Sequence, residues 1–182
     1  PKETDPVGPV GEYAQSALAR ERIFEYFSRQ NGTPISQLRL NYAIDLRYGV
    51  LRDIAEKVFQ RRPVDLATGY ANVIWQRDAN SIALRSFAHC ASPPFVLNMT
   101  GAEIISVREI AKRFGAIWGI EPRFEGAEAD TALLSDASLC RELFGPPEVS
   151  IRQMVEWLAH WIGRGGRGLG KPTHFEDRAG NF

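Results

Sequence analysis

The most reactive side chain near the start of the sequence is a tyrosine on a segment with helical periodicity. Tyr13 opens residues 11–30, in which apolar residues recur at helical spacing. A tyrosine held there can donate or accept a proton if a nearby cation or cofactor lowers its pKa from about 10. The same pattern describes a packed aromatic side chain whose hydroxyl reaches the surface, and on pattern alone that interpretation is favoured.

The elements that would position this tyrosine alternate between extended and helical patterns. Strands are expected at residues 35–43, 72–75, 95–98 and 122–124, and helices at residues 49–60, 78–91, 106–118, 139–144 and 150–162. Two of the helices begin with capping-box patterns, at Ser106 and at Ser150. This alternation predicts an α/β fold in which helices cover a sheet.

Composition excludes several classes of protein. The chain has 182 residues, is 44% hydrophobic and carries a formal net charge of zero, which argues against disorder and against non-specific binding of nucleic acid. No apolar run reaches the length of a membrane span. Cys90 and Cys140 are isolated, and the three histidines lack metal-ligand spacing, so no metal site is expected. The cysteine usage favours a reducing compartment, and a cytoplasmic location is the expectation.

Several segments together resemble a known family. Residues 11–22, Gly-Glu-Tyr-Ala-Gln-Ser-Ala-Leu-Ala-Arg-Glu-Arg, look like the Tyr-x-x-x-Lys helix of extended short-chain dehydrogenases/reductases, the NAD-dependent epimerase/dehydratase family. Residues 38–42, 73–79, 96–109 and 156–161 match later segments in order. The resemblance implies the carboxyl-terminal part of an NAD(P)-binding Rossmann-like fold together with a small α/β substrate-binding lobe.

The resemblance also implies roles for individual residues. Tyr13 would be the catalytic acid/base, and the nicotinamide of NAD or NADP would lie against the strand end at Leu40 and Tyr42. Asn41 and Thr68 would contact a sugar or sugar-nucleotide-like substrate, although Asn41 is equally well explained as a strand-end turn residue. The expected reaction is epimerisation or dehydration through transient hydride transfer. A homodimer through the helix that bears Tyr13 is a further implication.

The sequence departs from the family pattern at several positions. Ala17 stands where the family has its lysine, and Ala71 and Ala127 stand where it has diphosphate-binding arginines. No Gly-rich loop follows a strand, so the part of the fold that cradles the cofactor pyrophosphate is expected to lie before Pro1. These departures leave open an alternative: a non-catalytic relative that serves ligand sensing or protein association.

The expected organisation has three parts. Residues 1–48 would end the dinucleotide-binding domain, residues 49–162 would form the substrate-binding lobe with returning Rossmann elements, and residues 163–182 would be a Gly-rich tail. Basic residues in that tail suggest RNA contact as a minor alternative: Arg164, Arg167, Lys171 and Arg178. A flexible, solvated tail is the favoured interpretation. Residues 171–176 either clamp the tail to the body or form an exposed end.

Overall fold

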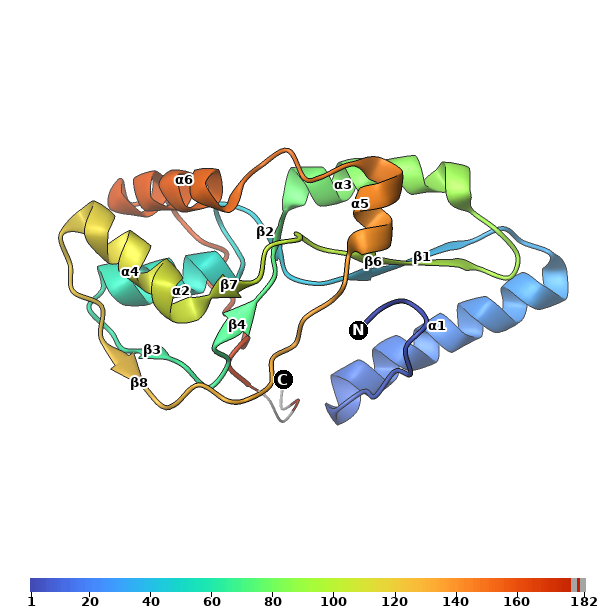
Figure 1. Ribbon diagram of the computed structural model, residues 1–182, viewed down its shortest axis with the longest axis horizontal. Coiled ribbons are helices and arrows are strands. Elements are labelled where there is room, and N and C mark those ends of the chain that lie inside the picture. Colours follow the sequence, from blue (N-terminus) through green and yellow to red (C-terminus); the bar gives the residue numbers. More distant parts are fainter. Residues whose placement is uncertain (178–179, 181–182) are drawn as a thin grey trace.

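The computed structural model describes residues 1–177 and 180, which form a mixed α/β fold (Figure 1). The helices are α1 (Gly11–Asn31), α2 (Val50–Phe59), α3 (Gln76–Arg85), the 3-10 helix η1 (Ser86–His89), α4 (Val107–Trp118), α5 (Ser138–Phe144) and α6 (Ile151–Gly163). The strands are β1 (Ser36–Leu40), β2 (Ala43–Ile44), β3 (Val64–Asp65), β4 (Tyr70–Ala71), β5 (Ile74–Trp75), β6 (Phe95–Met99), β7 (Ile105–Ser106) and β8 (Phe124–Glu125).

The strands pair two by two rather than in one broad sheet. Within the described residues, β1–β6, β2–β5 and β3–β8 are parallel pairs, whereas β4–β7 is antiparallel. The longest pair runs from Ser36 opposite Phe95 to Leu40 opposite Met99. Because β1 and β6 are parallel, their carboxyl ends lie at the same edge, where ligands bind in open α/β sheets.

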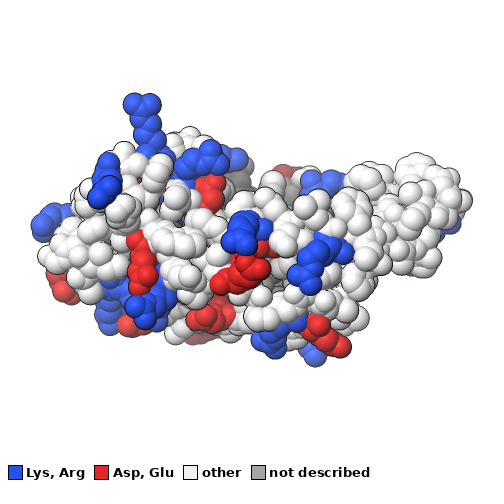
Figure 2. Space-filling model, turned by 90° about the horizontal axis from the view of Figure 1, so that it is seen from above, with Lys and Arg blue, Asp and Glu red and all other residues white. Residues whose placement is uncertain are grey.

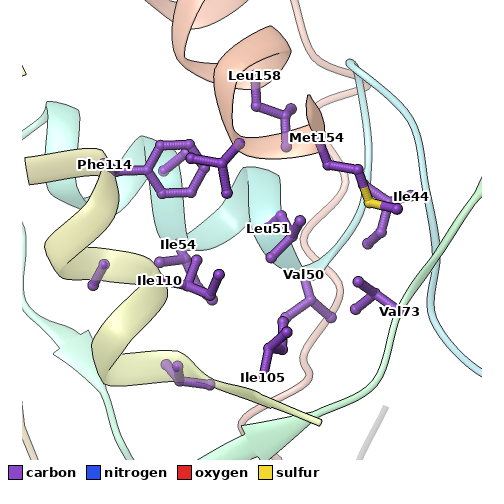
Figure 3. Close-up of a cluster of buried hydrophobic side chains, with 14 of the residues drawn as sticks. Ile44, Val50, Leu51, Ile54, Val73, Ile105, Ile110, Phe114, Met154 and Leu158 are labelled. Atoms are coloured by element: carbon purple, nitrogen blue, oxygen red, sulfur yellow. The ribbon is translucent and has the colours of Figure 1, made fainter. Parts of the chain in front are cut away.

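The main core lies between α2, α4 and α6, which gather at one end of the molecule and which we call the three-helix lobe (Figure 1). Leu51, Phe114 and Leu158 come from the three different helices, are fully buried and point toward one another (Figure 3). A second, smaller cluster joins Leu97 and Met99 of β6 to Ala79 of α3 and Cys140 of α5. The helices expected at residues 49–60, 106–118 and 150–162 are therefore present, and their apolar faces form the main core.

Helix α1 is the exception, because it extends along the other end of the molecule with its apolar residues in solvent (Figure 1). Gly32 ends it in a left-handed conformation, φ 64°, as the Asn-Gly pair predicted. Among the described residues of this helix, only Ser28 is buried, whereas Tyr13 is 68% exposed and Phe24 is 52% exposed. The expected burial of this apolar stripe does not occur within this chain.

Two predicted elements are shorter than expected. The strand expected at residues 35–43 is divided into β1 and β2, because Tyr42 adopts a left-handed backbone, φ 46°, that breaks the ladder. The helix expected at residues 78–91 ends at Arg85 and tightens into η1, where the Ser86 hydroxyl donates to the Ala83 carbonyl. Of the two capping boxes, Ser150 with Gln153 is complete, whereas the Glu109 carboxylate pairs with Lys112 instead.

The prediction of a flexible, solvated tail was wrong for residues 173–177, which pack on the body, whereas most of residues 163–172 are exposed. The Leu169 amide donates to the Arg47 carbonyl at 3.0 Å, and Phe175 is only 2% exposed within the main core. Residues 171–176 therefore clamp the tail to the body, because one buried aromatic ring and several hydrogen bonds offset the entropy of ordering the segment. Arg178 lies outside the described residues, and the division of the chain at residues 48 and 162 stays a prediction.

Candidate functional site

A cleft of about 880 Å³ opens between α1 and the strand β1. Tyr13 and Ala17 line it from the helix, and Leu40 and Asn41 line it from the carboxyl end of β1. Tyr13 and Ala17 share this side of α1 because residues four apart lie on one helix face. The structure thus brings together three of the five predicted site residues, Tyr13, Leu40 and Asn41.

Tyr13 lies in the first turn of α1 and is largely exposed. Its phenol lies close enough to Tyr48 to contribute to the raised pKa of that residue, after burial and the charge of Asp53. The two phenols come from segments 35 residues apart in sequence, so no local pattern predicts their proximity. A substrate hydroxyl in the cleft would meet Tyr13 at this corner.

Asn41 belongs to a hydrogen-bonded network at the strand end. Its side-chain nitrogen donates to the Asn72 side-chain oxygen at 2.8 Å and to the Leu133 carbonyl at 3.4 Å. Asn72 is 3% exposed and in turn donates to the Ser135 carbonyl at 2.7 Å. This network fixes the orientation of the Asn41 amide at the cleft wall, which is compatible both with a turn residue and with the predicted binding role.

Tyr42 and Thr68 lie away from the cleft. Tyr42 packs against the main core, and burial together with the nearby Glu176 carboxylate raises the pKa of its phenol. Thr68 is 2% exposed and is not among the residues that line the cleft. Leu40 is 48% exposed at the cleft, as expected for an apolar surface against which a flat ring could stack. The roles of all five residues stay predictions.

The sequence interpretation overlooked a charged pair in the cleft wall. Arg39 on β1 forms a salt bridge with Glu21 on α1, and this hydrogen bond raises the pKa of the guanidinium. Gln37 lies two residues earlier on the same strand face and donates to the Glu21 carbonyl at 2.8 Å. The alternation of Gln37 and Arg39 with leucines was a signal for a polar strand face that meets a helix.

Gly101, two residues after the end of β6, is required by close packing. A Cβ added at Gly101 would fall well inside van der Waals contact with the Val73 carbonyl oxygen. Only glycine therefore lets this turn approach the segment that carries the buried Asn72. Asn98, three residues earlier, is 4% exposed and donates its side-chain amide to the carbonyls of Pro1 and Asp136. Gly101 and Asn98 therefore fix the backbone segments that meet at the carboxyl end of β6.

The cleft fits one end of a nicotinamide cofactor better than the other. Leu40 offers an apolar surface and Tyr13 a phenol, which suits a nicotinamide ring beside a proton-transfer group. Ala17 supplies no cation for the ribose, and no Gly-rich strand-to-helix turn is present in the sequence to cradle the pyrophosphate. The residues present would hold the reacting end of the cofactor only.

The described part of the chain offers neither a metal site nor a membrane span. No cluster of three or more His, Cys, Asp or Glu side chains is placed to hold a metal ion there. None of the helices in the same residues combines the length and the apolar character needed to cross a bilayer. On the face shown in Figure 2, basic and acidic side chains are interspersed.

The fold is shared with solved sugar-nucleotide enzymes. The chain superimposes on a UDP-galactose 4-epimerase with a TM-score of 0.69 at 20% identity, covering 90% of this chain and 57% of that one. It superimposes on UDP-glucuronic acid 4-epimerase from Bacillus cereus, in complex with NAD, with a TM-score of 0.70 at 17% identity over 91% and 59% of the two chains. For dTDP-glucose 4,6-dehydratase from Bacillus anthracis, also with NAD, the TM-score is 0.73 at 13% identity over 90% and 55%.

These similarities establish the fold class. No protein-family model and no curated protein sequence matches the chain. At these low identities the superpositions show the fold alone, a mixed α/β, partial Rossmann-like fold. The chain spans a little more than half the length of each of these three structures, 55% to 59%.

Proposed function

We propose that this chain is the substrate-facing part of an NAD(P)-dependent enzyme that epimerises or dehydrates a sugar or sugar nucleotide. The observation that carries the proposal is the meeting of Tyr13, Leu40 and Asn41 in one cleft, at the carboxyl ends of parallel strands. The fold shared with two epimerases and a dehydratase supports the same reaction class. In this proposal the pyrophosphate cradle lies in sequence outside these 182 residues.

Each residue has a defined task in the proposed reaction. When bound, the cofactor would supply a hydride acceptor, and Tyr13 would act as the base that takes the proton from the substrate hydroxyl. Asn41, held by Asn72, hydrogen-bonds the sugar. Leu40 keeps water from the face of the nicotinamide.

Ala17 favours a second candidate, a non-catalytic relative that binds ligand or protein without turnover. The family lysine raises the reactivity of its tyrosine by placing a positive charge four residues away on the same helix face. Ala17 lines the cleft but carries no charge. If the fold serves sensing, the cleft would bind a sugar nucleotide and release it unchanged.

The deciding experiment is turnover of UDP-glucose and dTDP-glucose with added NAD by the protein that carries this sequence, assayed by chromatography of the sugar products. Tyr13→Phe is expected to lower kcat by about 100-fold or more, because it removes the proton-transferring oxygen. Tyr26→Phe is the matched control, since Tyr26 is an exposed phenol on the same helix.

Each outcome separates the two candidates. Unchanged turnover in Tyr13→Phe removes Tyr13 from the mechanism. Binding of UDP-glucose without turnover establishes the sensing alternative. Calorimetric titration of the 182-residue chain with NAD tests the location of the cradle: weak or undetectable binding is expected, and submicromolar affinity would contradict it.

A further inference from the structure

The carboxyl-terminal segment crosses from the three-helix lobe to the start of α1. We call residues 169–177, together with Gly180, the strap. It leaves α6, runs beside α2, and ends close to the amino-terminal end of the helix that carries Tyr13 (Figure 1). Thr173 and Glu176 of the strap therefore lie on α2, and Gly180 lies against the start of α1.

The strap is anchored on α2 by three kinds of contact. The Thr173 amide and hydroxyl both donate to one Asp53 carboxylate oxygen, at 2.8 Å and 2.5 Å. Glu176 accepts from Lys57 at 3.1 Å in a largely buried ion pair. Between them, Phe175 inserts into the main core. A segment with a charge-assisted double hydrogen bond, an ion pair and a buried ring has a defined position.

At its other end the strap packs backbone to backbone on α1. A Cβ added at Gly11 would lie 2.5 Å from the Gly180 carbonyl oxygen, and one added at Gly180 would lie 2.5 Å from the Val10 carbonyl oxygen. Both glycines also have a left-handed backbone, with φ 79° and 75°. Two glycines that face each other permit an approach that no side chain would allow.

The Tyr48 phenol lies near both Asp53, to which the strap is anchored, and Tyr13. The partly buried Tyr48 phenol is close enough to both Asp53 and Tyr13 for each to raise its pKa. Asp53 is the residue that Thr173 holds. Tyr13 therefore lies two residues after the Gly11–Gly180 packing and close to the Tyr48 phenol, which is itself near Asp53.

We propose that the strap is a positioning element for Tyr13. By binding Asp53 at one end and Val10–Gly11 at the other, it holds the first turn of α1 against the three-helix lobe and sets the place of the Tyr13 phenol in the cleft. Helix α1 needs such a tie because its own apolar residues contribute almost no burial. The inference concerns the position of Tyr13 and does not depend on the reaction proposed above.

The test measures the fluorine NMR resonance of a labelled Tyr13, which depends on the surroundings of its ring. The full chain is labelled with 3-fluorotyrosine, and the Tyr13 fluorine resonance is assigned by its loss in Tyr13→Phe. Thr173→Ala is expected to shift this resonance and to speed amide exchange in residues 10–16 about fivefold, the factor for one lost hydrogen bond of ~1 kcal/mol. Thr173→Ser keeps the hydroxyl and should restore both, and exposed Lys171→Ala should change neither.

A second pair of variants perturbs the distal contact and leaves the anchor intact. Gly180→Ala introduces a Cβ against Val10, whereas Gly170→Ala has a similar left-handed backbone, φ 67°, but no atom within 4 Å of its Cβ. Both carry the same backbone strain. Faster exchange in residues 10–16 for Gly180→Ala alone supports the strap. An unmoved Tyr13 resonance in both Thr173→Ala and Gly180→Ala overturns it, whatever the outcome of the turnover assay.

Discussion

Apolar residues recur along both α1 and α2, yet the two helices are held in place by different forces. In α2, apolar residues such as Leu51 and Ile54 are fully buried against α4 and α6. In the described structure of α1, Ser28 alone is buried. Polar contacts hold α1 instead: the Glu21–Arg39 salt bridge, the Gln37 bond to the Glu21 carbonyl, and the bonds between Ser28 and Ser92.

Apolar residues at helical spacing therefore predict a helix, but they do not show which part of the fold covers them. Burying a large apolar side chain stabilises a fold by roughly 1.5–3 kcal/mol, whereas a typical hydrogen bond contributes about 0.5–1.5 kcal/mol. The three-helix lobe therefore carries most of the stability. The side of the molecule that lines the cleft is positioned by a few directional contacts, including the strap.

Truncating one aromatic ring in each region tests whether the three-helix lobe contributes more stability than α1. Phe114 is fully buried and stacks on Trp118, so Phe114→Ala is expected to lower the free energy of unfolding by about 3–5 kcal/mol. Phe24 is 52% exposed on α1, so Phe24→Ala is expected to change it by about 0.5 kcal/mol or less. Equilibrium urea unfolding of both variants measures the two values.

A large loss of stability in Phe24→Ala would contradict the comparison, because it would mean that the α1 stripe is covered in solution. Sedimentation or light scattering of the wild-type chain in the same buffer then identifies a covering copy of the chain. A small loss in Phe114→Ala would show instead that the three-helix lobe is not the stabilising centre.

Much of the fold was predictable because local signals were strong. The Asn31–Gly32 pair ends α1, and the Ser150–Gln153 capping box opens α6, since both act within a few residues. The break at Tyr42 was not predictable, because its left-handed backbone is imposed by pairing with distant Ile74, whose amide binds the Tyr42 carbonyl. The docked tail was missed for a similar reason: Thr173 finds its partner 120 residues away.

Some residues of the candidate site were also predictable from local spacing, whereas others depend on tertiary packing. Tyr13 and Ala17 were placed on one face by helical spacing alone, and the cleft contains both. Thr68 was assigned by position in the family pattern, and its burial depends on tertiary packing that spacing does not encode. The Glu21–Arg39 pair joins two elements across a loop, so only the polar alternation along β1 gave a hint of it.

In the second core cluster, β6 is covered by α5 and not by α1. Cys140 is 3% exposed there, and burial together with the nearby Glu3 carboxylate raises the pKa of its thiol to about 11. Near pH 8 it should therefore alkylate on the order of 100-fold more slowly than an ordinary cysteine. Iodoacetamide labelling followed by peptide mass spectrometry measures the rate, with half-exposed Cys90 as the internal reference. Equal labelling of both cysteines would show that this cluster opens readily.

The smallest expected effect is a pH dependence of stability at the strap anchor. Burial raises the pKa of Asp53, and the two hydrogen bonds from Thr173 offset only part of that rise. A raised folded-state pKa contributes stability that is fully present below the unfolded value, about 3.9, and is lost as pH rises through the folded value. Asp53→Asn removes this titration, so the stability of wild type relative to the variant should fall across that window. Urea unfolding between pH 3.5 and 7 measures it.

Asp45 provides a control of opposite sign, because it lies in the segment that leads into α2, whereas Asp53 lies in the first turn of that helix. Partial burial alone would raise its pKa, but hydrogen bonds from Arg47 and the Tyr48 amide lower it overall. Its contribution is therefore present above the unfolded pKa and is lost as pH falls through the lowered one. The stability of wild type relative to Asp45→Asn should fall toward acid, whereas relative to Asp53→Asn it should rise. The same slope for both variants would mean that Asp53 is solvated, and thus that the strap does not cover it.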